Sequence, residues 1–248
     1  LTIVDLLWFD RTLAPLAGPG VYEATPRVVQ LLKEDPDWGR SFIRPPIAIY
    51  TDWSPPGGWA ANPDGWIEGR VYLPASVPQS FGLRTTGGYA GFVDPGHDAF
   101  LQAASGEAME TGDVALLSLI GTRYFLVEPG LEIPDLPAAD TPPFRVYQNP
   151  EAFPRAFTIG AVIPASTHAE ALSQTEALAR QGRLADTAVV RGDLGGFEPG
   201  RGAAAVVSVD EPRPERVAIA VHSQETTLVV LNERWDPGWR ARVDGRPA

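Results

Sequence analysis

The last fifth of the chain constrains its fold most strongly. It holds four short segments rich in β-branched and apolar residues, and turn residues separate them. In the last segment Trp239, Ala241 and Val243 alternate with charged residues, as in a strand with one solvated face. Successive short strands of this kind predict an antiparallel β-sandwich. The four expected strands span residues 203–209, 216–222, 226–231 and 239–243.

A hairpin turn is expected after the last of these strands. Asp244-Gly245 is a strong signal for a two-residue turn between antiparallel strands. The turn calls for a further strand, and the sequence to Ala248 leaves no room for one. We therefore expect the chain to be a piece of a longer protein.

Composition excludes several classes of protein. The 248 residues include 25 Gly and 25 Pro, which favour many turns and short strands over a helical bundle. The net charge of −11 repels phosphate backbones, so nucleic acid is not an expected partner. Without cysteine there is neither a disulfide nor a thiolate metal site. We expect no metal and no cofactor.

The first half mixes helices and strands. Thr25 as N-cap and Pro26 at the first helical position predict a helix that Pro36 ends. Two more helices are expected at 98–104 and 113–120, each opened by an aspartate. Expected strands lie around Phe42 and at residues 47–50, 123–127 and 144–148. The stretches 52–69 and 129–143 are predicted to be loops.

The second half begins with a β-α-β pattern. A strand is predicted at 155–163, a helix capped by Ser166 at 166–181, and a strand at 187–190. The fold class is therefore α+β: a mixed α/β N-terminal part and a β-rich part that ends in the antiparallel sandwich. We expect a domain over residues 1–141 and another over residues 142–248.

Tryptophans in the loop 52–69 suggest a sugar site. Trp53, Trp59 and Trp66 lie within this loop, and indole faces pack on the C–H faces of sugar rings. Tyr89 and Asp94 in the next glycine-rich stretch complete the candidate glycan-binding set. Trp235 and Trp239 are weaker candidates for the same contact. The alternative is that these rings close a loop-rich core.

Catalytic signals are weak. Glycoside hydrolysis needs two facing carboxylates, and several acidic residues have aromatic neighbours. These are Asp52, Asp64, Glu68 and Asp94. The three histidines, His97, His168 and His222, show no ligand spacing. Asp35-Pro-Asp37 has the form of an acidic metal motif, but it follows a predicted helix end and is interpreted as a stop signal. No catalytic or metal residue is assigned.

Several segments in order resemble the extracytoplasmic region of YfhO-type bacterial membrane proteins, which are similar to C-type glycosyltransferases. The resemblance covers the chain from about Thr25 to its end, and its most specific motifs are Tyr-Gln-Asn-Pro followed by Pro-Arg-Ala-Phe, and Pro-Gly-Trp followed by Val-Asp-Gly. The segments are 25–32, 87–95, 116–126, 144–150, 153–157 and 237–246.

The resemblance implies a location and a role. The chain is expected at the extracytoplasmic face of the bacterial cell membrane, with the transmembrane part of the same protein as its partner. It carries no catalytic residue itself and binds or orients a cell-envelope glycan acceptor. The alternatives are a scaffold without a ligand and, less favoured, a glycoside hydrolase.

Overall fold

The computed structural model describes most of the chain after residue 93 and parts of it before. The described residues are 25–35, 37, 39–44, 69–74, 77–87, 94–192, 196, 198, 200, 204–213 and 215–247. They fall into two compact units. Unit 1 comprises residues 1–92 and 103–152, and unit 2 comprises residues 93–102 and 153–248. The expected boundary at 141/142 falls between two paired strands of unit 1.

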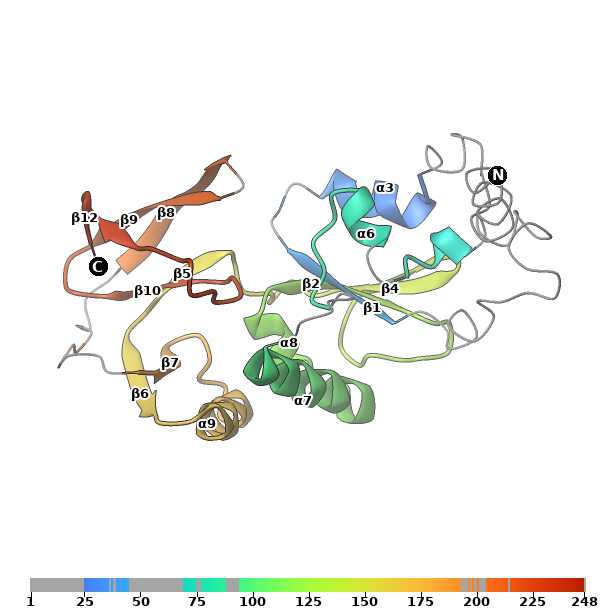
Figure 1. The fold of residues 1–248 in the computed structure, drawn as a ribbon. Coiled ribbons are helices and arrows are strands. Elements are labelled where there is room, and N and C mark those ends of the chain that lie inside the picture. The colour runs from blue at the N-terminus through green and yellow to red at the C-terminus, as the bar shows by residue number, and fades with distance from the viewer. Residues whose placement is uncertain are drawn as a thin grey trace, which may run out of the picture. The chain divides into compact units, whose positions relative to one another are not determined.

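Unit 1 is built on a four-stranded mixed sheet of order β1-β2-β4-β3 (Figure 1). β1 (Arg40–Arg44) runs parallel to β2 (Thr122–Val127), and β2 runs antiparallel to β4 (Phe144–Gln148). The strands predicted around Phe42 and at 123–127 and 144–148 are confirmed. The strand expected at 47–50 lies outside the described residues.

The fourth strand corrects the prediction of a loop over 129–143. β3 (Ala138–Thr141) pairs antiparallel with β4 along its whole length. Three of its four side chains are exposed, so no apolar alternation marks it in the sequence. Pairing with a buried neighbour, not its own composition, makes this segment a strand.

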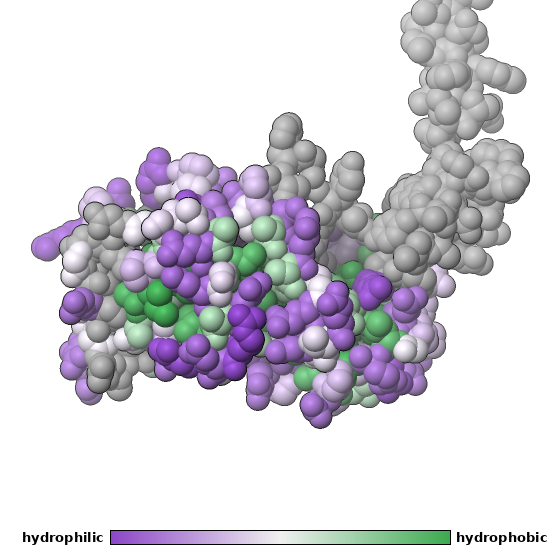
Figure 2. Space-filling view, turned by 90° about the horizontal axis from the view of Figure 1, so that it is seen from below, coloured by the Kyte–Doolittle hydropathy of each residue, from purple (hydrophilic) through white to green (hydrophobic). Residues whose placement is uncertain are grey.

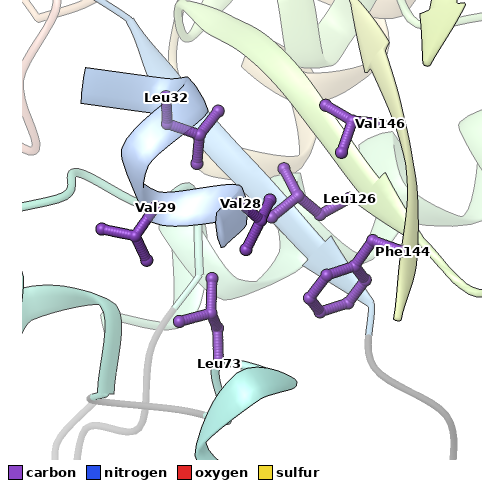
Figure 3. Packing of buried hydrophobic residues seen from close by; sticks show 7 residues of the cluster. All are labelled: Val28, Val29, Leu32, Leu73, Leu126, Phe144 and Val146. Atoms are coloured by element: carbon purple, nitrogen blue, oxygen red, sulfur yellow. The ribbon is translucent and has the colours of Figure 1, made fainter. Parts of the chain in front are cut away.

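Helix α3 (Arg27–Glu34) covers the sheet with an apolar face. Val28, Val29 and Leu32 pack against Leu73 and against residues of β2 and β4, and Figure 3 shows these side chains converging. The predicted helix is confirmed, but its N-cap is Pro26, not Thr25, and no side chain caps it. It ends at Asp35, which is extended because the following Pro36 disfavours the helical conformation.

Two further helices follow in the chain, α7 (Pro95–Thr111) and α8 (Ala115–Leu119). The helix expected at 98–104 is therefore longer at both ends. Its start was misplaced because Asp94, not Asp98, accepts the first free N–H groups. It continues past Gly106 because Ala104 and Ala108 are buried on one side of it. The helix predicted at 113–120 is confirmed in part, but its N-cap is Val114, not Asp113. The Asp113 carboxylate accepts the N–H of Ala115, the first helical residue, at 2.8 Å from one position further out.

Unit 2 begins with the predicted β-α-β unit. β6 (Ala161–Ala165) and β7 (Thr187–Arg191) are parallel, and α9 (His168–Arg180) connects them. The cap of α9 is Thr167, not Ser166: its hydroxyl accepts the N–H of Glu170 at 3.1 Å. The Glu170 carboxylate in turn accepts the N–H of Ser166, a variant of the capping box.

The strand expected at 155–163 is two strands in different sheets. β5 (Ala156–Ile159) pairs antiparallel with β10 (Leu228–Leu231), whereas β6 pairs with β7. The chain changes sheets at Gly160, and the N–H groups of Gly160 and Ala161 both bond to the carbonyl of Asp186. A continuous apolar run in the sequence does not reveal such a break.

The C-terminal strands confirm a β-rich part within an α+β protein. β8 (Ala204–Arg213) and β9 (Arg216–Ser223) form an antiparallel hairpin. The strand expected at 239–243 shrinks to β11 (Arg242–Val243), because Trp239 lies in a turn. The strand thought to be missing after Asp244-Gly245 is present as β12 (Arg246–Pro247). Both turn residues have positive φ, 49° and 80°, as a type I′ hairpin requires.

Candidate functional site

Most of the candidate glycan-binding set lies outside the described residues. This holds for Trp53, Trp59, Trp66 and Tyr89, and also for the candidate carboxylates Asp52, Asp64 and Glu68. Asp94 is the member of the set that the structure describes, so the structure brings no two members together.

Asp94 caps helix α7. Its Oδ1 accepts the backbone N–H of His97 at 2.8 Å, and its carbonyl oxygen accepts the N–H of Asp98 at 2.9 Å. The His97 N–H and the nearby charge of His168 lower the pKa of the Asp94 carboxyl, outweighing its desolvation. This exposed carboxylate is ionised at neutral pH, where it stabilises the helix terminus as an N-cap and as a negative charge.

Two of the histidines lie near Asp94, although they are far apart in the sequence. Gly96 packs so closely on the ring of His168 that a Cβ at Gly96 would overlap that ring. His97 belongs to the first turn of α7, and His168 is the first residue of α9. Among the described residues, no three His, Asp or Glu side chains are grouped closely enough to hold a metal ion. The first residues of α7 and α9 therefore lie together, and Asp94 lies near His97 and His168.

A polar cluster of unit 1 joins two acids to two side chains of β2. Arg123 donates to Asp35 through Nε at 2.6 Å and to Asp37 through Nη2 at 2.7 Å, and the Tyr124 hydroxyl donates to Asp35 at 2.5 Å. Burial raises the pKa of Asp35, but the bonds from Tyr124 and Arg123 outweigh burial and lower it. Asp35-Pro-Asp37 is therefore tied to the sheet as a structural link.

Asn149, in the Tyr-Gln-Asn-Pro motif, is buried and connects several elements of unit 1. It is 1% exposed, and its amide nitrogen donates to the Ser118 hydroxyl at 2.8 Å and to the Thr122 carbonyl at 3.0 Å. Its Oδ1 accepts the N–H of Glu151 at 3.0 Å. The residue thus joins the end of α8, the start of β2 and the turn after β4.

Arg155, in the Pro-Arg-Ala-Phe motif, has the same role in unit 2. Its side chain is 9% exposed and forms ion pairs with Glu211 at the end of β8 and with Glu233 after β10, the latter at 3.0 Å. Its carbonyl accepts the N–H of the buried Asn232 at 2.7 Å. The side chain therefore connects β5 to two other strands.

Trp235 and Trp239 are the two tryptophans that the structure describes, and both are exposed. Trp235 is 69% and Trp239 40% exposed, in the turn that follows β10. The Trp239 indole N–H donates to the carbonyl of Arg234 at 3.2 Å, so the ring is held at one edge. The sequence signal for this site was the Pro-Gly turn between two tryptophans, which cannot distinguish packed rings from exposed ones.

Comparison of the chain with protein-family models, with curated proteins and with solved structures found no match. In the part of the chain that the structure describes, no helix combines the length and apolar character needed to cross a bilayer.

Proposed function

We propose that the chain is a non-catalytic extracytoplasmic domain of a polytopic, glycosyltransferase-like membrane protein, where it binds or orients a cell-envelope glycan acceptor. The resemblance to YfhO-type proteins from Thr25 onward supports this proposal. The proposed partner within the same protein is its transmembrane part, and the proposed location is the extracytoplasmic face of the bacterial membrane.

One observation carries the non-catalytic part of the proposal. In two of the motifs that carry the resemblance, those that contain Asn149 and Arg155, these polar residues are buried and bonded to other strands and helices. A catalytic polar group must instead reach a substrate. These two motifs stabilise the fold. We therefore assign ligand contact to the tryptophans of the loop 52–69.

The same observation favours a second candidate, a scaffold without a ligand. Asp94, the described member of the candidate glycan set, uses its Oδ1 to cap α7. A domain in which Asn149, Arg155 and Asp94 all maintain internal contacts is also what a spacer on a membrane protein needs. The two candidates differ in whether the tryptophans of the loop 52–69 contact sugar.

Tryptophan fluorescence distinguishes a glycan-binding domain from a scaffold without a ligand. A neutral chitin oligosaccharide, chosen as an analogue of the cell-wall backbone, is titrated into the full chain. Binding through the loop shifts the emission, and the triple variant W53A/W59A/W66A loses that shift while Trp235 and Trp239 remain. An unchanged emission in the wild-type chain supports the scaffold. Release of new reducing ends from the sugar contradicts the non-catalytic proposal and revives the hydrolase.

A further inference from the structure

The segment 234–247, here named the Trp–Arg turn, is exposed along its whole length. It contains the turn with Trp235 and Trp239 and the small hairpin β11–β12. An exposed pair of large aromatic side chains on a folded surface indicates an interaction site. On the face drawn in Figure 2, hydrophobic residues reach the surface in several places among hydrophilic ones.

The turn is internally fixed. The Asp236 carboxylate accepts the N–H of Gly238 at 2.7 Å, and the Asp236 carbonyl accepts the N–H of Trp239 at 3.0 Å. Arg240 folds back and donates to the carbonyls of Pro237 and Trp239, both at 2.8 Å. Because these bonds hold the turn before any ligand arrives, binding loses little conformational entropy.

The charge of the Trp–Arg turn opposes that of the whole chain. It contains four arginines and two aspartates, a local net charge of +2, whereas the chain carries −11. In the hairpin, Val243 lies opposite Arg246 and Arg242 lies opposite Pro247, so each face presents one guanidinium. A negatively charged partner is attracted here and repelled by the rest of the surface.

The tryptophans help to distinguish a sugar from a membrane surface as the negatively charged partner. The Trp239 N–H is already bonded to Arg234, so the ring offers its face. A face-on indole suits the C–H face of a sugar ring. A membrane interface, in contrast, commonly engages the polar end of the indole as well. The observations together favour a sugar over a bilayer.

We infer that the Trp–Arg turn binds a glycan whose sugar rings carry negative charge, with Trp235 and Trp239 contacting the rings and Arg242 and Arg246 pairing with the charges. This inference rests on the proposed function in one respect, the class of ligand. It concerns residues outside the loop 52–69, so each can fail without the other.

Paired ligands test the inference with the full chain. Oligogalacturonate carries the charge, and its methyl ester carries the same rings without it. We expect calorimetry to show binding of the charged oligosaccharide, weakened by added salt. W235A lowers the affinity about tenfold, the loss of roughly one ring contact, and W235F retains most of it. The double variant R242Q/R246Q binds the charged sugar and the ester equally.

Several outcomes overturn the inference. One is no binding by the wild-type chain, and another is affinity unchanged by W235A although the variant keeps the wild-type melting temperature. A third is a shift in Trp emission with anionic phosphatidylglycerol vesicles but not with the oligosaccharide, which assigns the turn to a membrane surface. If W53A/W59A/W66A keeps the binding that W235A loses, the inference stands whatever the chitin titration shows for the loop 52–69.

Discussion

At the scale of single residues, the two units depend on a few polar side chains with several partners. Arg155 is nearly buried and faces Glu211 and Glu233, and Arg123 faces Asp35 and Asp37. A buried charge is tolerated only while its partners satisfy it. Such residues tolerate substitution less than their surface neighbours do.

Arg155→Ala therefore destabilises unit 2. Removing the guanidinium leaves two carboxylates near each other without their shared cation, and the expected loss is about 3 kcal/mol. Urea denaturation followed by circular dichroism measures it. The matched control is Arg216→Ala on β9, an exposed arginine for which a change below about 0.5 kcal/mol is expected. Equal losses in the two variants would refute the role given to Arg155.

Ionisation of Tyr124 is expected to lower the stability of the folded chain at alkaline pH. Burial and the bond to Asp35 raise the pKa of its hydroxyl to about 12, from an ordinary value of 10.0. The folded state favours the neutral phenol, and this preference contributes to the free energy of unfolding. The contribution is complete below pH 10 and is lost as the pH rises to about 12. After solvent screening it amounts to about 1 kcal/mol.

Comparing the wild-type chain with Tyr124→Phe at pH 9 and pH 12 checks this. The wild-type chain should lose more stability between the two values than the variant does. Absorbance of phenolate should show a tyrosine that titrates near pH 12 in the folded chain and near pH 10 in urea, and folded Tyr124→Phe should lack it. A titration that is the same in both conditions contradicts the raised pKa.

At the scale of elements, Gly106 within helix α7 and Gly112 directly after it have different roles. Gly106 lies inside the helix with no atom within 4 Å of the place where a Cβ would stand. Gly112 ends the helix at φ +78°, and a Cβ there would overlap the ring of Pro134. Gly106 therefore destabilises the helix relative to alanine. Gly112 is required for the left-handed backbone conformation that ends the helix.

Opposite effects are therefore expected from the same substitution at these positions. Gly106→Ala raises stability by about 0.5–1 kcal/mol, because alanine loses less backbone freedom on folding. Gly112→Ala lowers stability by about 1 kcal/mol or more, through backbone strain and overlap with Pro134. Thermal unfolding of both variants alongside the wild-type chain decides this, and changes of the same sign contradict it.

At the scale of the whole molecule, burial is uneven between the units. Unit 1 encloses a cluster of fully buried side chains, including Leu126 at 0% exposure. In unit 2, none of the described side chains of β8, β9 and β10 is buried, and Val229 is 37% exposed. Stability from apolar burial is therefore concentrated in unit 1.

This contrast predicts unequal costs for truncating apolar side chains. Leu126→Ala removes buried atoms and leaves a cavity, at a cost of about 2–5 kcal/mol. Val229→Ala removes partly hydrated atoms and costs less than about 1 kcal/mol. Chemical denaturation of the two variants measures both values. A cost for Val229→Ala near that of Leu126→Ala would show that β10 is covered in solution.

Local sequence determined much of the fold. Apolar periodicity placed α3, β2, β4 and α9, and Asp244-Gly245 specified its hairpin, because these signals depend on residues close together in the chain. Tertiary contacts decided that 138–141 is a strand, that α7 runs through Gly106, and that the chain changes sheets at Gly160. They also buried Asn149 and Arg155, brought His168 against Gly96, and left Trp235 and Trp239 exposed. For the paired and buried groups the deciding partner is distant in sequence, and the free energy of burial or pairing with it outweighs the local preference.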